Sequence, residues 1–369
     1  METDTSENIS NKTIQVKISR LAIIAISLAL CGLILFFAGI KTSKLPKPLD
    51  SREPLYAIFL ELSLLFLFSG FILGIISMIK IEISGGKITG NNFAVGAILV
   101  SIFSGFLSFG TLFVTRFHTI ANRMVCGTSL SGIGKAILIY AYDYDDKLPR
   151  AGGENSTWGT SVKWNAETRE QAFGLNSDGT GGQATISSSL YLLIKYAEVT
   201  PKSFICKGDK KMSLFEPEKY GSKNKDLTDL WDFGPEPWRH NSYSYSMPYG
   251  PYPLTSSSNS DIAVTADRNP WIPSLGWKVK NFAAFNPDGD KNVIKIGNAP
   301  THANEGQNVL YLDTHVNFET TSLCGINKDN IYTSWNGSDI RKGTPPKVGS
   351  QPASNIDSLL VNDPPAKKQ

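Results

Sequence analysis

The chain has 369 residues, a formal net charge of +3 and 41% hydrophobic residues, with 32 glycines and 20 prolines. It contains no block rich in Lys and Arg, so a nucleic-acid partner has little electrostatic support and we expect none. Its four cysteines show no CxxC or CxxH spacing, which excludes the usual zinc-finger patterns.

Three apolar runs occupy the first third of the chain, at Leu21–Ile40, Leu55–Ile79 and Phe93–Thr115, and together they contain one charged residue, Glu61. Each is long enough to cross a hydrocarbon core of about 30 Å at about 1.5 Å per helical residue. The runs predict three transmembrane helices, with a lipid bilayer as partner. The loops on the two sides of the membrane carry nearly equal numbers of Lys and Arg, so charge does not fix the orientation of the helices in the membrane.

An amphipathic helix is predicted directly after the third run. Its apolar positions recur at spacings of three and four residues, which lines one helix face. These positions are Leu130, Ile133, Ile137, Tyr140 and Tyr144. No strong breaker separates this segment from the third run, so the membrane helix is expected to continue into it as one long rod.

The sequence after residue 150 predicts short elements. The helix is expected at Ser187–Ala197, and the strands at Ser203–Cys206, Ile262–Ala266, Asn308–Leu312 and His315–Glu319. The last two strands form a hairpin if residues 313 and 314 make a two-residue turn. Its buried face would then consist of Val309, Tyr311, Val316 and Phe318.

These features divide the chain into four parts. They are a cytoplasmic tail at 1–20, a three-helix membrane domain at 21–115, a C-terminal domain at 116–342 and a Pro-rich, disordered tail at 343–369. Three cysteines fall in the C-terminal domain, Cys126, Cys206 and Cys324. If this domain lies outside the cytoplasm, one disulfide and one free thiol are expected.

Four motifs occur in an order that resembles a known bacterial arrangement. The segment Leu73–Val100 reads LGIISMIKIEISGGKITGNNFAVGAILV and is similar to a small membrane domain of unknown function, in which a Gly-Gly hairpin links hydrophobic helices. The segment Cys126–Pro149, CGTSLSGIGKAILIYAYDYDDKLP, resembles the end of the long helix of prepilin-like proteins. The segments Phe204–Asp209 (FICKGD) and His302–Val316 resemble their F-x-C-P-S-D and H-x(9)-D-G elements.

This resemblance implies an α+β fold, in which the last of three transmembrane helices leads into a pilin-like long helix packed on an antiparallel sheet. It also implies an extracytoplasmic position, no established enzyme activity, and a disulfide between Cys126 and Cys206, which match family cysteines. The chain departs from the family pattern in lacking a G-F-T-L-x-E processing site. Ten residues separate His302 from Asp313 where the family has nine, and Thr314 replaces the expected glycine.

Four side chains could carry chemistry, namely Asp267, His302, Asp313 and His315. Imidazoles and carboxylates that converge from a loop and a hairpin could bind a divalent metal, and a metal-activated water would permit hydrolysis. The alternative to a metal or catalytic site is a structural role, in which a hydrogen bond between His302 and Asp313 holds the segment that leads into the hairpin. The structural interpretation is favoured because the four residues show no diagnostic spacing.

Two further groups were weighed as ligand sites. Asp288, Asp290 and Asn292 alternate like the first oxygen ligands of a calcium loop, but Val293 replaces the required glycine, so a plain turn is favoured. An aromatic stretch could stack on a sugar or peptide, or could simply cover a sheet. It consists of Trp231, Trp238, Tyr243, Tyr245, Tyr249 and Tyr252.

The sequence therefore predicts a non-enzymatic, membrane-anchored, pilin-like protein. It is expected to span the cytoplasmic (inner) membrane several times and to display its C-terminal domain outside, in envelope assembly or secretion. Its expected partners besides the bilayer are other envelope proteins or polysaccharide, and no cofactor is expected. Two alternatives stay open: a divalent-metal-dependent envelope hydrolase, and a glycan- or peptide-binding module.

Overall fold

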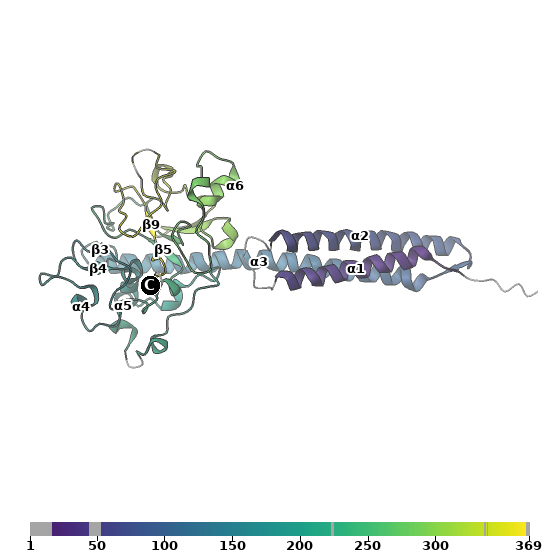
Figure 1. The fold of residues 1–369 in the computed structure, drawn as a ribbon, viewed down its shortest axis with the longest axis horizontal. Coiled ribbons are helices and arrows are strands. Elements are labelled where there is room, and N and C mark those ends of the chain that lie inside the picture. Colours follow the sequence, from purple (N-terminus) through teal and green to yellow (C-terminus); the bar gives the residue numbers. More distant parts are fainter. Residues whose placement is uncertain (1–16, 44–52, 223–224, 336, 338, 367–369) are drawn as a thin grey trace, which may run out of the picture. The chain divides into compact units, whose positions relative to one another are not determined.

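The computed structural model describes residues 17–43, 53–222, 225–335, 337 and 339–366 (Figure 1). The chain forms two compact units, Met1–Phe117 and His118–Gln369. The helix α3, Asn91–Asp143, is 53 residues long and runs from the first unit into the second. The expected continuous rod is thus present as a single helix.

The N-terminal unit is a bundle of α1 (Arg20–Ser43), α2 (Glu53–Ile83) and the first part of α3 (Figure 1). Small residues allow the helices to approach closely, as in membrane helix pairs. A Cβ atom added at Gly70 of α2 would lie 3.0 Å from the backbone of Ala29 in α1. The short strands β1 (Lys17–Ile18) and β2 (Ile88–Thr89) pair in parallel, so the start of α1 and the α2–α3 loop lie at the same end of the bundle.

Among the residues that the structure describes, four helical segments are long and apolar enough to cross a membrane, where the sequence predicts three. They are Arg20–Lys41, Ile58–Ile83, Asn91–Gly110 and Thr119–Asp143. The fourth is the C-terminal part of α3 and coincides with the predicted amphipathic helix. It differs from the other three because its apolar stripe is buried within the C-terminal unit: Leu130, Ile133 and Ile137 are each at most 2% exposed.

The C-terminal unit contains a five-stranded antiparallel sheet with the order β8-β7-β6-β5-β9. Its strands are β5 (Tyr243–Ser246), β6 (Ala263–Asp267), β7 (Gln307–Tyr311), β8 (Val316–Glu319) and β9 (Leu360–Val361). The other elements are β3 (Thr157–Trp158), α4 (Arg169–Phe173), β4 (Gln183–Ala184), α5 (Ile186–Tyr196) and α6 (Lys291–Ile294). Short 3₁₀ helices lie at Pro201–Phe204, Pro217–Tyr220, Leu227–Asp229, Pro237–Arg239, Phe282–Ala284, Lys295–Gly297, His302–Asn304 and Ile326–Lys328.

Both faces of this sheet are covered. On one face, the apolar stripe of α3 joins Leu310 and Val361 in the main core cluster, which also contains α5. On the other face, Val309 and Tyr311 pack with aromatic residues of the loops. Because successive side chains of a strand point to opposite faces, β7 contributes to both cores.

The hairpin β7–β8 has a different register from the predicted one. Leu310 pairs with Val316 and Asn308 with Phe318, so Val309 and Tyr311 lie on the opposite face from Val316 and Phe318. The turn contains one residue more than expected, because Tyr311 bonds through its N–H to the carbonyl of His315. Thr314 has a φ of +72°, as a three-residue turn requires at its last position. A shift of one residue moves every side chain to the other face.

The C-terminal segment is folded rather than disordered. Leu360 and Val361 add β9 to the edge of β5, and the carboxylate of Asp363 is buried. Leu359, Leu360 and Val361, each fully buried, supply the apolar surface that the Pro-rich composition obscures. The strand expected at Ser203–Cys206 is also wrong: its first residues form the 3₁₀ helix Pro201–Phe204, which begins with proline.

Candidate functional site

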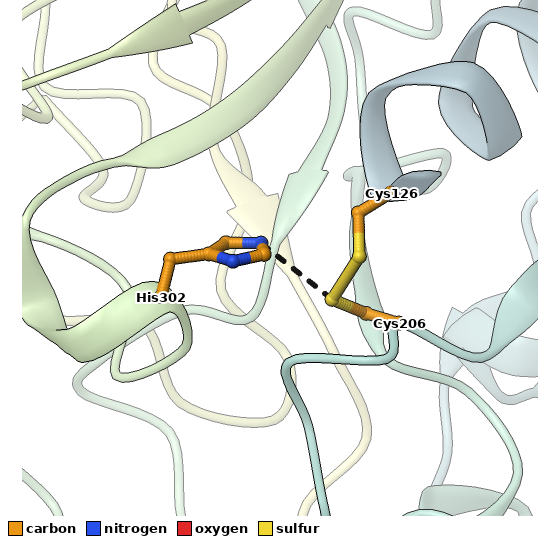
Figure 2. A group of neighbouring side chains, drawn as sticks. All are labelled: Cys126, Cys206 and His302. Atoms are coloured by element: carbon orange, nitrogen blue, oxygen red, sulfur yellow. Dashed lines mark hydrogen bonds between the residues drawn. A yellow bond between two sulfur atoms is a disulfide. The ribbon is translucent and has the colours of Figure 1, made fainter. Parts of the chain in front are cut away.

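A disulfide joins Cys126 of α3 to Cys206, which follows the 3₁₀ helix Pro201–Phe204 (Figure 2). The two Cα atoms are 5.3 Å apart, and both side chains are buried. Cys31 and Cys324 are free. The bond links positions 80 residues apart, which in the chain-entropy model stabilises the folded unit by about 4 kcal/mol.

The imidazole of His302 lies against this disulfide (Figure 2). Its Nε2 atom is 3.6 Å from Sγ of Cys206 and 3.4 Å from Oδ2 of Asp267. The amide Nδ2 of Asn308 lies 3.3 Å from the same nitrogen. Three polar groups thus converge on one ring atom in a site where every side chain is buried.

The sheet and a strained turn together position these groups. Asp267 ends β6 beside Asn308 of β7, and the backbone N–H of Asn308 donates to Asp267 Oδ2 at 2.7 Å. His302, Ala303 and Asn304 have φ values of +54°, +58° and +58°. Left-handed conformations cost about 1–2 kcal/mol for ordinary residues, so the surrounding packing must hold this turn in place.

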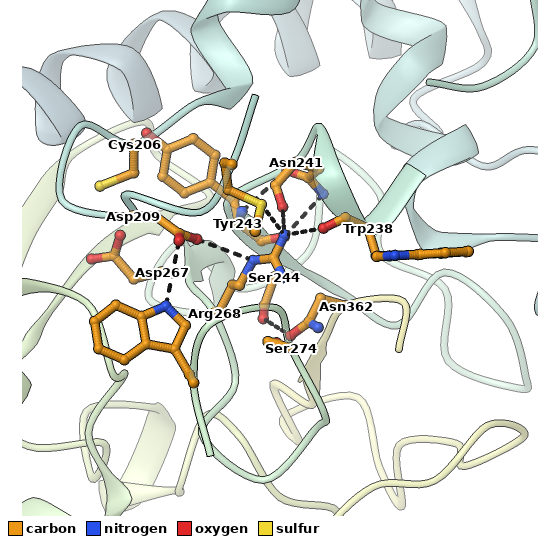
Figure 3. Close-up of polar contacts among 12 residues, drawn as sticks. Cys206, Asp209, Trp238, Asn241, Tyr243, Ser244, Asp267, Arg268, Ser274 and Asn362 are labelled. Carbon is orange, nitrogen blue, oxygen red and sulfur yellow. Dashed lines mark hydrogen bonds and ion pairs between the residues drawn. The ribbon is translucent and has the colours of Figure 1, made fainter. Parts of the chain in front are cut away.

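A buried ion pair between Asp209 and Arg268 lies near Cys206 and Asp267 of this cluster (Figure 3). Arg268 Nε is 3.4 Å from Oδ2 of Asp209, and Arg268 also donates to the carbonyls of Trp238 and Asn241. Burial lowers the pKa of Arg268, and the nearby Asp209 partly offsets this. Burial likewise raises the pKa of Asp209, against the effect of Arg268. The sequence motifs FICKGD and ADRN contain these two residues, but their spacing of 59 positions gives no sign that they pair.

The four residues predicted as possible metal ligands lie in two separate places in the structure, two residues in each. His302 lies with Asp267 in the buried cluster, whereas Asp313 accepts a hydrogen bond from His315 at the exposed hairpin turn. The predicted contact between His302 and Asp313 is therefore wrong. The two residues lie near opposite ends of β7, and five residues of extended strand separate such positions by about 16 Å.

The predicted calcium ligands also have other partners. Both carboxylate oxygens of Asp288 bind Arg341, at 2.6 and 3.2 Å. Asp290 is the N-cap of α6, where its Oδ1 accepts from the backbone N–H of Asn292 at 2.8 Å and of Val293 at 3.0 Å. The sequence favours a plain turn here, and the structure adds the short helix α6 directly after it.

The aromatic stretch is mainly a packing element. Five of its six members are buried, namely Trp231, Trp238, Tyr243, Tyr245 and Tyr249. Tyr252 is 40% exposed. Because the rings fill the core between the sheet and the loops, they do not form an open aromatic platform.

Sequence reasoning misses an open cavity of about 490 Å³ in the C-terminal unit. Its lining includes Tyr144, Arg150, Arg169, Tyr196 and Trp231. Arg150 Nη2 bonds to the carbonyl of Gly153 at 3.1 Å, and Arg169 bonds to that of Gly152. Within the described ranges, no carboxylate forms an ion pair with either arginine. Two lining residues, Trp231 and Tyr245, belong to the aromatic stretch identified in the sequence. The sequence does not show that they meet residues of α3, α5 and several loops around one cavity.

No family model matches the chain, and no curated protein and no solved structure matches it either. Two sites in the C-terminal unit are therefore the candidates for function. The first is a buried Cys-Cys-His-Asp cluster that holds loops to the sheet. The second is a solvent-open cavity lined by aromatic rings, by Lys147 and two arginines, and by the carboxylates of Asp145 and Glu154.

Proposed function

We propose that the protein is a membrane-anchored, non-enzymatic, pilin-like protein that displays its C-terminal unit outside the cytoplasmic membrane. The observation that carries this proposal is the buried disulfide Cys126–Cys206. Disulfides persist in oxidising compartments and are rare in the cytosol, where thiol systems keep cysteines reduced. A disulfide that joins α3 to a distant loop fits a domain that folds after export.

The bundle supports the same topology. The parallel pairing of β1 with β2 holds the start of α1 and the α2–α3 loop at one end. A helix that starts at this end and crosses the bilayer delivers its C-terminus to the other side. With the N-terminus in the cytoplasm, the unit that follows α3 lies outside.

This topology requires that the chain cross the membrane three times. A fourth helical segment, Thr119–Asp143, is also apolar enough to cross it. We assign Thr119–Asp143 to the displayed unit because it is built into that unit's structure. Cys126 is tied to Cys206, and Arg123 forms an ion pair with Glu305. A segment with these contacts cannot also present its apolar stripe to lipid.

A display or assembly role fits the chemistry better than catalysis. His302 and Asp267 are buried at no more than 4% exposure, so a substrate cannot reach them in this conformation. A long helix packed on one face of an antiparallel sheet supports the pilin-like interpretation. Envelope assembly or secretion is the corresponding role.

The test is the redox state of the cysteines in growing cells. Cells are quenched in acid, free thiols are alkylated and the digest is analysed by mass spectrometry without reduction. We expect Cys126 joined to Cys206, with Cys31 and Cys324 alkylated. Four alkylated cysteines, or a Cys206–Cys324 pair, would contradict the proposal.

The cavity favours a second candidate function, the binding of an anionic glycan or peptide. Tyr144 and Tyr196 are 37% and 41% exposed, so their rings are accessible beside Arg150 and Arg169. Trp231 also lines the cavity, and its fluorescence should be quenched by acidic envelope polysaccharides. A substitution of Arg169 by Gln should weaken this quenching, whereas the same change at Arg341, outside the lining, should not.

A further inference from the structure

Three ligand atoms in the buried cluster have the proximity of a metal site. The Sγ atoms of Cys126 and Cys206 and a ring nitrogen of His302 all lie within 4.8 Å of one another. Among the described residues, no other group of three His, Cys, Asp or Glu side chains meets this condition. The carboxylate of Asp267 lies beside this group, with its Oδ2 3.4 Å from Nε2 of His302, and it is the nearest candidate for a fourth donor although it is not within 4.8 Å of all three atoms.

The separations between these atoms match the edges of a tetrahedron around zinc. Bonds of about 2.3 Å to sulfur and about 2.0–2.1 Å to nitrogen or oxygen imply ligand separations of about 3.3–3.8 Å. Nε2 of His302 is 3.6 Å from Cys206 Sγ and 3.4 Å from Asp267 Oδ2, so two edges already have the required length. The two sulfur atoms must separate, which breaking the disulfide permits, and the Asp267 carboxylate must move toward them, because it does not lie within 4.8 Å of all three other ligand atoms.

The surroundings also suit a metal-bound thiolate and carboxylate. The backbone N–H of Gly208 lies 3.3 Å from Cys206 Sγ, a contact that stabilises negative charge on sulfur. Asn308 holds Oδ2 of Asp267 through its backbone N–H at 2.7 Å. The other carboxylate oxygen, Oδ1, is buried without a hydrogen-bond partner in the described part of the chain. An unpaired buried carboxylate oxygen is costly, and a cation bound to the same carboxylate would lower that cost.

We propose that the reduced protein binds one Zn²⁺ through Cys126, Cys206, His302 and Asp267, so that the same cysteines form a disulfide or a zinc site. In vitro, a phosphine reductant cleaves the S–S bond and becomes a phosphine oxide by taking oxygen from water. The two sulfurs each gain a proton. Zn²⁺ then displaces both thiol protons into solvent, and the imidazole binds in its neutral form through Nε2.

Four protein ligands leave no position for water, so this zinc is structural and does not catalyse hydrolysis. It replaces the disulfide as the link between α3 and the loop after Phe204, and adds His302 and β6 to that link. The inference does not depend on where the C-terminal unit lies. In a reducing compartment the unit is held by zinc, and in an oxidising one by the disulfide.

The test uses the full-length protein in detergent, either oxidised or reduced with a phosphine under anaerobic conditions. Each sample is incubated with zinc, freed of unbound metal by gel filtration and analysed for its metal content. We expect about one zinc per chain in the reduced protein and less than about a tenth of that in the oxidised protein. Equal zinc content in both states would overturn the proposal, as would the absence of zinc from the reduced protein. This comparison needs no variant.

Variants then identify the ligands. His302→Ala should weaken zinc binding to the reduced protein by at least about tenfold, as loss of a ligand or its support does. Cys324→Ser removes a half-buried thiol outside the cluster and should leave binding unchanged. A Cys126→Ser, Cys206→Ser double variant that still bound zinc as tightly as the reduced wild-type protein would also refute the proposal.

Cobalt distinguishes a tetrahedral thiolate site from loose metal binding. Reduced wild-type protein with Co²⁺ should show a thiolate-to-cobalt charge-transfer band and intense d–d bands. Asp267→Asn should keep the charge-transfer band and shift the d–d bands, because it alters the oxygen ligand alone. A spectrum of octahedral cobalt, with weak d–d bands and no charge-transfer band, would contradict the assigned ligands.

Discussion

At the residue scale, two glycines on α3 have opposite surroundings. A Cβ atom at Gly134 would lie 2.7 Å from Cδ1 of Leu310, which is buried, whereas a Cβ atom at Gly132 would meet no atom within 4 Å. Gly134 therefore allows the helix to approach β7. Gly132 has no such packing role, and glycine in a helix interior is unfavourable relative to alanine.

The two alanine substitutions should change stability with opposite signs. Gly134→Ala should lower the free energy of unfolding by about 1–3 kcal/mol through overpacking. Gly132→Ala should raise it by about 0.5–1 kcal/mol through helix propensity. Chemical denaturation of the full-length protein in detergent measures both. If Gly134→Ala proved as stabilising as Gly132→Ala, the close packing of α3 on β7 would be wrong.

Asp232 should make stability depend on pH. Burial, reinforced by the nearby Asp363, raises its pKa from 3.8 to about 8. Because the folded state keeps this proton to higher pH than the unfolded state, the associated stabilisation is full below about pH 4 and is lost as pH rises to about 8.

Asp232→Asn should therefore reduce the fall in unfolding free energy between pH 4 and pH 8, by up to about 1.4 kcal/mol per pH unit. Denaturation at several pH values measures the slope. Asp329, whose pKa burial raises to about 7, leaves a residual slope of the same sign. The exposed control Asp261→Asn should keep the wild-type slope, and an equal slope for Asp232→Asn would contradict the assignment.

At the scale of elements, the stripe on α3 carries much of the core. Ile137 is 2% exposed, whereas Lys135 on the same helix is exposed. Ile137→Ala should cost about 2–4 kcal/mol, from lost transfer free energy and the cavity it leaves. Lys135→Ala should cost less than about 0.5 kcal/mol. Thermal melts that show equally mild effects would mean that the stripe faces solvent or a partner subunit.

The C-terminal segment should prove equally important. Asp363 accepts hydrogen bonds from the backbone N–H groups of Ile186 and Ser187 at 2.9 and 2.7 Å, and from Trp158 Nε1 at 3.0 Å. It therefore caps α5 from 176 residues away. Asp363→Ala should cost about 2–3 kcal/mol, since it leaves three buried donors unpaired. The exposed control Asp261→Ala should cost less than about 0.5 kcal/mol, and an equal cost in both melts would indicate that the segment is dispensable.

Local pattern predicts some of these elements and not others. The helical periodicity from Leu130 to Tyr140 identifies the buried face of α3 because the spacing alone defines it. The strand β5 is not predictable from local pattern, since YSYS has no run of apolar residues although all four of its side chains are buried. β9 is two residues long within a Pro-rich segment, and only its pairing with β5 defines it.

The site depends on sheet register more than on motifs. His302 and Asp267 can both be singled out as chemically capable, but their contact follows from the pairing of β6 with β7. The competing choice, Asp313, is nearer in sequence and matches a family motif. It lies at the far end of β7, where the positive φ of Thr314 sets the turn. The pairing of the strands, which a local motif does not reveal, therefore determines that the imidazole of His302 contacts Asp267 and not Asp313.

At the scale of the whole molecule, the central claim is that the C-terminal unit lies outside the cytoplasmic membrane. This arrangement is supported by the disulfide, by the single long helix α3, and by the pairing of β1 with β2, which places the start of α1 and the α2–α3 loop at one end of the bundle. It also accounts for the burial of the apolar stripe at 119–143 within the C-terminal unit. If that segment crossed the membrane instead, the unit would return to the cytoplasm.

Paired reporter fusions test this claim most directly. Alkaline phosphatase, which is active only outside the cytoplasm, and a reporter active only inside it are each fused after Gln369 and, as an internal control, after Gly86. We predict an active phosphatase and a silent cytoplasmic reporter after Gln369, with the reverse pattern after Gly86. A silent phosphatase and an active cytoplasmic reporter after Gln369 would contradict the account.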